Sequence, residues 1–248
     1  MKTNESIIEG RNACIEAIRA GKTIEKIYVL NGCEDGPIRT ILREAAKKKI
    51  IVERVDKETL DRLAQTGHHQ GVVLRCAAYE YSSLEDILAK AEAAGEPPFI
   101  IILDDIEDPH NLGAIIRTAN LAGAHGVIIH NRRAVGLTDT VVKTSAGAVN
   151  YTPVAKVTNI AKTIEELKKQ GMWFVCADMD GSRMYDLNLT GPMGLVIGNE
   201  GNGVSRLVKE KCDFVASIPM KGDIDSLNAS VACGVLAYEI VRQRAFSK

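Results

Sequence analysis

Short apolar runs and amphipathic stretches alternate along the chain and predict a succession of strands and helices. In the first 76 residues, apolar runs predict strands at 26–30, 50–55 and 71–75. The stretches between them predict helices at 11–20, 37–48 and 57–65, and Pro37 is a favoured residue type for the start of a helix. Together these elements predict a small α/β domain.

The second half of the chain repeats the pattern with stronger apolar runs. Residues 99–103 (FIIIL) and 127–129 are apolar without interruption, as in parallel strands that helices cover on both faces. Further strands are predicted at 173–177, 195–197 and 214–218, and helices at 111–122, 160–170, 204–210 and 227–244. The predicted fold class is therefore α/β, with a mostly parallel C-terminal sheet carrying helices on both faces, plus the small N-terminal α/β domain.

Charge divides the chain into three parts. Residues 1–78 carry 14 basic and 11 acidic side chains, residues 79–98 carry one lysine and five acids, and residues 99–248 carry 16 of each sign. The acidic part ends in a Pro-Pro pair at 97–98, which halts a helix. We predict two domains, at 1–76 and 99–248, joined at 77–98 by a linker with a short helical piece.

Composition excludes several classes of protein. The net charge of -1 argues against a globally basic nucleic-acid binder but permits a local basic patch. No apolar run approaches the roughly 18–20 residues of a membrane span, and the N-terminus lacks a signal-like apolar core. The six cysteines are far apart, without a C-x-x-C pair, and predict neither a zinc site nor a disulfide framework. We expect a cytoplasmic protein that uses no metal.

Asn111 and Arg117 are the candidate reactive residues in the first of three segments that follow a strand and precede a helix. Ligands of open α/β sheets bind at that carboxyl edge. Six helical residues turn the chain by about 600°, so the two side chains would point about 120° apart if both were helical. They converge if Asn111 still lies in the loop as a cap. In the alternative interpretation, Asn111 only caps the helix and Arg117 only pairs with Asp104, Asp105 or Asp108.

The glycine spacing of the second segment, residues 194–203, limits the choice of ligand. Gly198, Gly201 and Gly203 follow the order G-x-x-G-x-G, the reverse of the dinucleotide fingerprint, and no Gly-Lys-Ser/Thr follows. This excludes a P-loop and disfavours a dinucleotide-dependent oxidoreductase. The segment predicts a loop whose backbone approaches a ligand closely, with the carboxylate of Glu200 inside it.

The third segment, residues 218–230, leads into a long helix. Ser226 or Asp225 is the expected N-cap, with Asn228 and Ser230 in the first turn. The free N–H groups of a helix N-terminus suit a carboxylate or an adenine edge. A catalytic triad is disfavoured, because no G-x-S-x-G motif exists and His110 is the only histidine near these segments.

Basic side chains gather on two predicted helices of the N-terminal domain. One carries Arg39, Arg43, Lys47, Lys48 and Lys49, and the other carries Arg11, Arg19 and Lys22. A charge run is usually a solvated helix face. Here it lies on the positive part of an otherwise neutral chain, which favours a phosphate-binding surface. The candidate RNA-binding residues are Arg11, Arg39, Arg43, Lys47, Lys48, His69 and Gln70.

A resemblance to a known family rests on three motifs: DPHNLGAIIRTA (108–119), LVIGNEGNGVSRL (195–207) and IPMKGDIDSLNASVACG (218–234). In this order they resemble the SpoU (TrmH-type) branch of the SPOUT superfamily of RNA ribose 2′-O-methyltransferases. IIEGRNACIEAI near the N-terminus and HHQGVVL at 68–74 look like the substrate-binding domain of the subgroup that methylates a guanosine ribose in bacterial 23S ribosomal RNA. The resemblance extends over the whole chain, and it makes 1–76 the RNA-binding domain and 99–248 the catalytic domain.

This resemblance implies S-adenosylmethionine as cofactor, RNA as substrate, and a homodimer whose sites are completed near the subunit interface. It also implies a deep trefoil knot, which general topology rules would not predict. The helix at 227–244, apolar at Leu227, Val231, Val235 and Leu236, is either part of that interface or ordinary core. By the resemblance, loops hold the cofactor largely through backbone groups, at positions Gly198, Glu200, Gly201, Ile218, Met220, Leu227 and Asn228.

The implied chemistry assigns a role to each candidate catalytic residue. A ribose 2′-hydroxyl is a poor nucleophile near neutral pH, so it must be positioned and lose its proton as the bond to the methyl group forms. Arg117 is expected to polarise it with help from the neighbouring phosphate, because an arginine is protonated and accepts a proton only through such a relay. Asn111 would orient Arg117 or the ribose, Glu200 would be the counter-ion of Arg117, and Ser226 and Asn228 would shape the pocket.

Two alternatives to this function stay open. The first is the same chemistry on transfer RNA, although the N-terminal domain, which the transfer-RNA enzymes of the family commonly lack, favours ribosomal RNA. The second is a non-catalytic RNA-binding or ribosome-assembly protein that keeps the fold. The presence of the complete candidate catalytic set argues against it.

Overall fold

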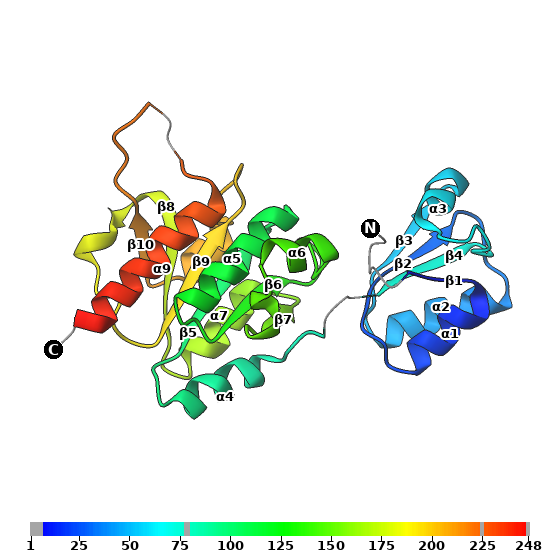
Figure 1. Cartoon of the computed structure of the whole chain (residues 1–248), viewed down its shortest axis with the longest axis horizontal. Helices are drawn as coiled ribbons and strands as arrows, with labels where there is room; N and C mark the ends of the chain where they lie inside the picture. The colour runs from blue at the N-terminus through cyan, green and yellow to red at the C-terminus, as the bar shows by residue number, and fades with distance from the viewer. Residues whose placement is uncertain (1–6, 77–79, 224–225, 247–248) are drawn as a thin grey trace. The chain divides into compact units, whose positions relative to one another are not determined.

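The computed structural model describes residues 7–76, 80–223 and 226–246. These residues form two units (Figure 1): the first holds the described residues up to 80 together with 136–139, and the second holds the rest. The predicted boundary between residues 76 and 77 borders a gap at 77–79, and the candidate cap Asp225 also lies outside the described residues.

The first unit is a four-stranded sheet covered on both faces. Its strands are β1 (Ile7–Glu9), β2 (Ile24–Leu30), β3 (Val52–Val55) and β4 (Val72–Cys76), in the order β1-β4-β2-β3, with β4 antiparallel to both of its neighbours. Ile27 and Val29 of β2 pack in the cluster that includes residues of α1 (Arg11–Arg19) and α2 (Gly36–Lys47), whereas Tyr28 packs with Leu60 of α3 (Lys57–Leu63). This alternation follows the two-residue period of a strand.

The second unit is built on a six-stranded sheet. In the order of the sheet its strands are β10 (Phe214–Ser217), β8 (Trp173–Arg183), β9 (Met193–Gly198), β5 (Phe99–Asp104), β6 (Gly126–His130) and β7 (Val154–Val157). Every pair of neighbours in this order is parallel. All six residues of β5 are buried, which explains its uninterrupted apolar run. The predicted fold class is confirmed, and the trefoil knot stays a prediction of the resemblance.

Helices cover both faces of this sheet. Ile100 and Ile102 of β5 pack with residues of α4 (Leu84–Ala94), α7 (Ile160–Lys168) and α8 (Arg206–Lys211). On the other face, α5 (Pro109–Leu121) packs against α9 (Ala229–Phe246), and α9 also contacts β9. A short helix, α6 (Asp139–Thr144), lies beside α5, and two 3-10 turns span Ala148–Asn150 and Met184–Asp186.

The short helical piece predicted within the linker at 77–98 is present, and it belongs to the second unit. Its residues 84–94 form α4, which begins with a capping box in which Ser83 and Asp86 exchange side chain-to-backbone hydrogen bonds. Ile87 of α4 is fully buried in the core of the second unit. Burial of an apolar side chain of this size stabilises by roughly 1.5–3 kcal/mol, so α4 is an integral part of the second unit.

Several further elements depart from the predictions. β1, β7 and α6 were not predicted, because each is too short to show a clear period. The strand predicted at 173–177 continues to Arg183 as β8, where Gly181 allows the backbone of Val215 in β10 to come close. In the described part of the chain no helix combines the length and apolarity of a membrane span.

Candidate functional site

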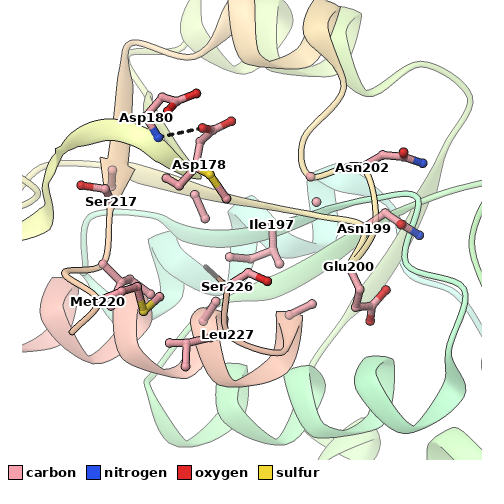
Figure 2. Close-up of a pocket in the computed structure, with 18 of the residues that line it drawn as sticks. Asp178, Asp180, Ile197, Asn199, Glu200, Asn202, Ser217, Met220, Ser226 and Leu227 are labelled. Carbon is pink, nitrogen blue, oxygen red and sulfur yellow. Dashed lines mark hydrogen bonds between the residues drawn. The ribbon is translucent and has the colours of Figure 1, made fainter. Parts of the chain in front are cut away.

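A pocket of about 730 Å³ lies at the carboxyl ends of β8, β9 and β10, beside the start of α9 (Figure 2). Its walls include Ile197 and Gly198 of β9, Ser217 at the end of β10, Ile218 directly after it, and Leu227 before α9. The pocket therefore lies at the edge where open α/β sheets usually bind their ligands. The predicted residues Gly198, Glu200, Gly201, Ile218, Met220, Ser226 and Leu227 all line this pocket.

A tight loop after β9 forms one wall of the pocket. Asn199 and Gly203 exchange two backbone hydrogen bonds, of 3.1 and 2.8 Å, which close the loop on itself. A Cβ at Gly198 would overlap the backbone of Gly203, and Gly203 has a φ of 64°, so both positions suit glycine. The Asn199 side chain donates to the carbonyl of Asp105 at 3.0 Å and fixes the loop to the end of β5. Glu200 is thereby held beside the pocket.

Asn111 connects the three motif segments. Its side-chain Nδ2 donates to Glu200 Oε1, and its Oδ1 accepts a hydrogen bond of 3.0 Å from Asn228 Nδ2. Only 7 % of Asn111 is exposed, so its hydrogen bonds are made inside the protein. Three residues that the sequence placed in separate segments thus meet at one point. Within the single chain Glu200 binds Asn111 and forms no ion pair with Arg117 among the described residues, so its role as the counter-ion of Arg117 stays a prediction.

The caps of two helices differ from those predicted. Asp108 caps α5 by accepting from the N–H of His110 at 2.9 Å, so Asn111 lies within the helix instead of the loop. α9 begins at Ala229, two residues later than predicted. Asn228 takes the cap position, because its Oδ1 accepts from the N–H of Ser230 at 3.0 Å, and Ser226 precedes the helix.

Arg117 points away from this cluster. Asn111 and Arg117 are both helical, so their side chains are separated by the roughly 120° that the helical repeat imposes. Arg117 is exposed, forms no ion pair or hydrogen bond with any described residue, and does not line the pocket. The pairing with Asp104, Asp105 or Asp108 that the alternative interpretation required is also absent from the described ranges.

Two acidic residues and one arginine of β8 line the pocket and were missed in the sequence. Asp178, Asp180 and Arg183 belong to the part of β8 beyond the predicted strand end. Burial raises the pKa of Asp178, but hydrogen bonds from Lys209 Nζ at 2.7 Å and from the N–H of Asp180 at 3.0 Å outweigh it, so the pKa lies below its ordinary value. Asp178 and Asp180 follow the predicted apolar strand at its carboxyl end, and this position could have identified them as pocket residues from the sequence.

The predicted RNA-binding residues of the first unit fall into two groups. Arg39, Arg43 and Lys47 lie at four-residue spacing on α2 and are exposed, although Glu44 pairs with Arg43 at 3.5 Å and Lys47 at 3.0 Å. Lys48 is exposed but donates to the carbonyl of Ile18. The second group (Arg11, His69 and Gln70) is engaged within the unit: Arg11 pairs with Asp35 at 2.5 Å and binds Gln70, and His69 is buried.

The cysteines and histidines give no sign of a metal centre. All six cysteines are free thiols. Within the ranges that the structure describes, no three His, Cys, Asp or Glu side chains are grouped as a metal would need. Burial raises the pKa of Cys14 and of Cys233 to about 12, so both thiols stay protonated at neutral pH.

Two family profiles match the chain in the order of its two units. A profile described as RNA 2′-O ribose methyltransferase substrate binding matches residues 7–82, and one described as the SpoU rRNA Methylase family matches residues 98–238. The chain is 47% identical over 247 residues to YacO of Bacillus subtilis, which is assigned to the TrmH family of tRNA/rRNA methyltransferases, and the match covers 98% of both chains.

Two solved structures resemble the whole chain. The SpoU methyltransferase AviRb from Streptomyces viridochromogenes, crystallised with AdoMet, is 26% identical with a TM-score of 0.63, and the match covers 98% of this chain and 92% of AviRb. An AdoMet-bound rRNA methyltransferase from Sinorhizobium meliloti is 25% identical with a TM-score of 0.59, and the match covers 95% of this chain and 86% of the other. Both similarities include the first unit as well as the sheet that carries the pocket.

Proposed function

The chain belongs to the SpoU rRNA methylase family, and from that premise we propose that it transfers a methyl group from S-adenosylmethionine to a ribose 2′-hydroxyl of ribosomal RNA. The observation that carries the proposal is the meeting of Asn111, Glu200 and Asn228 beside the pocket. This cluster joins the loop after β9, which would hold the cofactor, to α5, whose first turn would face the RNA acceptor.

The pocket suits S-adenosylmethionine in size and chemistry. A pocket of about 730 Å³ falls within the range of small-molecule sites, and its apolar part includes Ile197, Met220 and Leu227. Glu200 adds a carboxylate to the wall that suits a cationic ligand, whereas the charge of Asp178, which stays ionised because its pKa is low, is paired with Lys209. When bound, the cofactor supplies an electrophilic methyl group on a sulfonium. Asn111 and Asn228 would then hold Glu200 in place beside it.

Arg117 is proposed to act on the acceptor hydroxyl at a site completed by a second copy of the chain. In one chain it does not line the pocket. The adjacent helices α5 and α9 leave apolar side chains in solvent, with Leu121 65 %, Val231 50 % and Tyr238 50 % exposed. Leu236, by contrast, is fully buried, so the apolar stripe predicted on α9 is divided between core and surface. A homodimer that covers the exposed residues would bring Arg117 next to a pocket.

Ribosomal RNA is the favoured substrate because the first unit matches a substrate-binding profile of RNA ribose methyltransferases. Transfer RNA is the second candidate, since the YacO relative is assigned to a family that includes both activities. A guanosine of 23S ribosomal RNA is the proposed target. The cytoplasm, where ribosomal RNA and reduced thiols are found, is the proposed compartment.

The decisive experiment measures transfer of labelled methyl groups to 23S ribosomal RNA and transfer RNA transcripts, followed by mapping of 2′-O-methylated positions. We expect incorporation into the ribosomal transcript. Arg117→Ala should lower turnover by about 100-fold or more, while calorimetry shows nearly unchanged binding of S-adenosylmethionine. Near-native turnover of this variant would remove Arg117 from the mechanism. An absence of heat on cofactor titration would instead support a non-catalytic RNA-binding protein.

A further inference from the structure

Buried and strained groups hold the loop at residues 65–70 of the first unit, called here the anchored loop. It connects α3 to β4 and exposes Thr66, Gly67 and His68 at its tip. Three separate elements send a polar side chain to it. Loops are normally the more mobile parts of a fold, so anchors from several elements indicate that this loop is held in one conformation.

The first anchor is Glu9 of β1. Its Oε1 accepts from the N–H groups of Gln65 at 3.2 Å and Thr66 at 2.7 Å. Charge-assisted hydrogen bonds to backbone N–H groups are among the stronger ones in proteins. They fix the start of the anchored loop and leave the tip beyond Thr66 free to contact solvent.

The second anchor is the His69–Asp61 pair. His69 Nδ1 accepts from the N–H of Gly71 at 3.0 Å, so Nε2 carries the proton and donates to Asp61 Oδ1 at 2.8 Å. Because only 8 % of His69 is exposed and both ring nitrogens are used, its ring holds the loop from inside. This assigns His69 a positioning role in place of the direct RNA contact predicted from the sequence.

The third anchor is Arg11 at the start of α1. Its N–H donates to Gln70 Oε1 at 3.1 Å and its Nε donates to the Gln70 carbonyl at 3.0 Å. Gln70 has a φ of 52°, a left-handed conformation that is strained for a residue with a side chain. The surrounding hydrogen bonds retain that conformation, so the end of the loop is held as firmly as its start.

We propose that the anchored loop is a preorganised recognition site for unpaired RNA nucleotides, with His68 as the ring on which a base stacks. This rests on the proposed function, because RNA is the polymer that a substrate-binding domain of this family would contact. Sequence-specific RNA recognition targets unstacked bases, which stack on aromatic side chains including histidine. His68 is exposed between two fixed loop ends, and Gly67 beside it has no side chain to obstruct a base.

The experiment measures binding of the full chain to a labelled 23S ribosomal RNA transcript over a range of salt concentrations. His68→Ala should weaken affinity by about 5- to 150-fold, the loss of one stacked base, and His68→Phe, which keeps a ring, should retain most of it. Because stacking releases no counterions, the salt slope of the affinity should not change in either variant. Unchanged affinity of His68→Ala would overturn the proposal, as would equal losses in His68→Ala and His68→Phe.

A second pair of variants tests the anchors. Glu9→Gln retains an acceptor for the two N–H groups and should keep the affinity, whereas Glu9→Ala should lower it by increasing the mobility of the tip. Methyl transfer is measured separately over a range of RNA concentrations, where His68→Ala should raise KM for RNA and leave kcat at saturating RNA unchanged. Failure of the wild-type chain to methylate RNA would reject the proposed reaction, while the binding comparison would still decide the role of the loop.

Discussion

Asn111 links three segments of the site through its side-chain amide. Its amide donates to Glu200 and accepts from Asn228, so both ends of one short side chain are used. A buried polar group left without its partner costs about 1–3 kcal/mol. The residue therefore ties α5 to two segments that lie 89 and 117 positions further along the chain.

Asn111→Ala is predicted to lower both cofactor affinity and methyl transfer. The change leaves Glu200 and Asn228 without this partner, so we expect roughly tenfold or weaker binding of S-adenosylmethionine and about 1–3 kcal/mol lower stability. Calorimetry and urea unfolding measure the two effects. Asn120→Ala, on the same helix and without a side-chain hydrogen bond to any described residue, is the matched control and should behave as wild type. Equal behaviour of the two variants would contradict the role of Asn111.

At the scale of elements, small residues decide which helices can touch. Gly113 of α5 lies against α6, and a Cβ there would overlap Thr144 Oγ1 and Cβ. Gly234 of α9 lies in ordinary surroundings, where a Cβ would be 4.0 Å from Thr118. Both glycines are helical, so the difference between them is one of packing and not of backbone conformation.

Gly113→Ala and Gly234→Ala should therefore change stability in opposite directions. Overpacking between α5 and α6 is expected to cost about 1–3 kcal/mol in the first variant. The second gains the better helix propensity of alanine, up to about 1 kcal/mol, because nothing obstructs the added methyl group. Urea unfolding at a fixed protein concentration compares them. If Gly113→Ala were more stable than wild type, α6 would have to move away from the added methyl group without loss of stability, which would contradict the prediction.

The exposed basic side chains at and after the end of α2 are expected to supply the electrostatic part of RNA binding. Replacing Arg43, Lys47 and Lys48 together with glutamine should weaken RNA binding and lower the salt slope of the affinity, by up to about one unit for each phosphate that is no longer neutralised. This differs from His68→Ala, which should leave the slope unchanged. Titration of the 23S transcript at several salt concentrations measures both the affinity and its salt slope. If affinity and slope both stay at wild-type values, α2 is not the docking surface.

At the scale of the whole molecule, two buried histidines make stability depend on pH. Burial is the main cause that lowers the pKa of His125, and the positive charges of Lys90 and Arg244 lower it further, while the negative charge of Glu96 acts to raise it. The Nδ1 of His125 accepts a hydrogen bond of 3.0 Å from the N–H of Phe99. Burial and the charge of Arg133 lower the pKa of His130, whose Nδ1 accepts from two backbone N–H groups. Both rings are held in their neutral form.

The sign of the pH effect follows from these directions. In the unfolded chain the histidines take up a proton near about pH 6.5, whereas in the folded protein they do so only at lower pH. Their contribution to stability is therefore complete above about pH 6.5 and is lost as the pH falls below it. Urea unfolding between about pH 7.5 and 5.5 should show this decline, and His125→Asn, which keeps an acceptor for Phe99, should show a smaller one. A stability that rises as the pH falls over the same interval would contradict it.

Much of this arrangement was predictable from local patterns. Two-residue and 3.6-residue periods indicated most strands and helices, and the position of polar loops after apolar runs indicated the edge that carries the pocket. The segments that hold Asn111, Glu200 and Asn228 were recognised because each combines chemistry-bearing residues with a strand end. β1 and α6, of three and six residues, were missed because neither is an apolar run and both are too short to show a period.

What the sequence determined by itself is the kind of most elements and the set of chemical groups available, because both depend on neighbouring residues. What only the tertiary structure decided is which of these groups meet. Glu200 binds Asn111 and leaves Arg117 exposed, since the start of α5 at Pro109 sets the direction of both side chains. His69 turns inward to Asp61 while His68 faces solvent. Such contacts depend on the packing of distant segments, which no local pattern records.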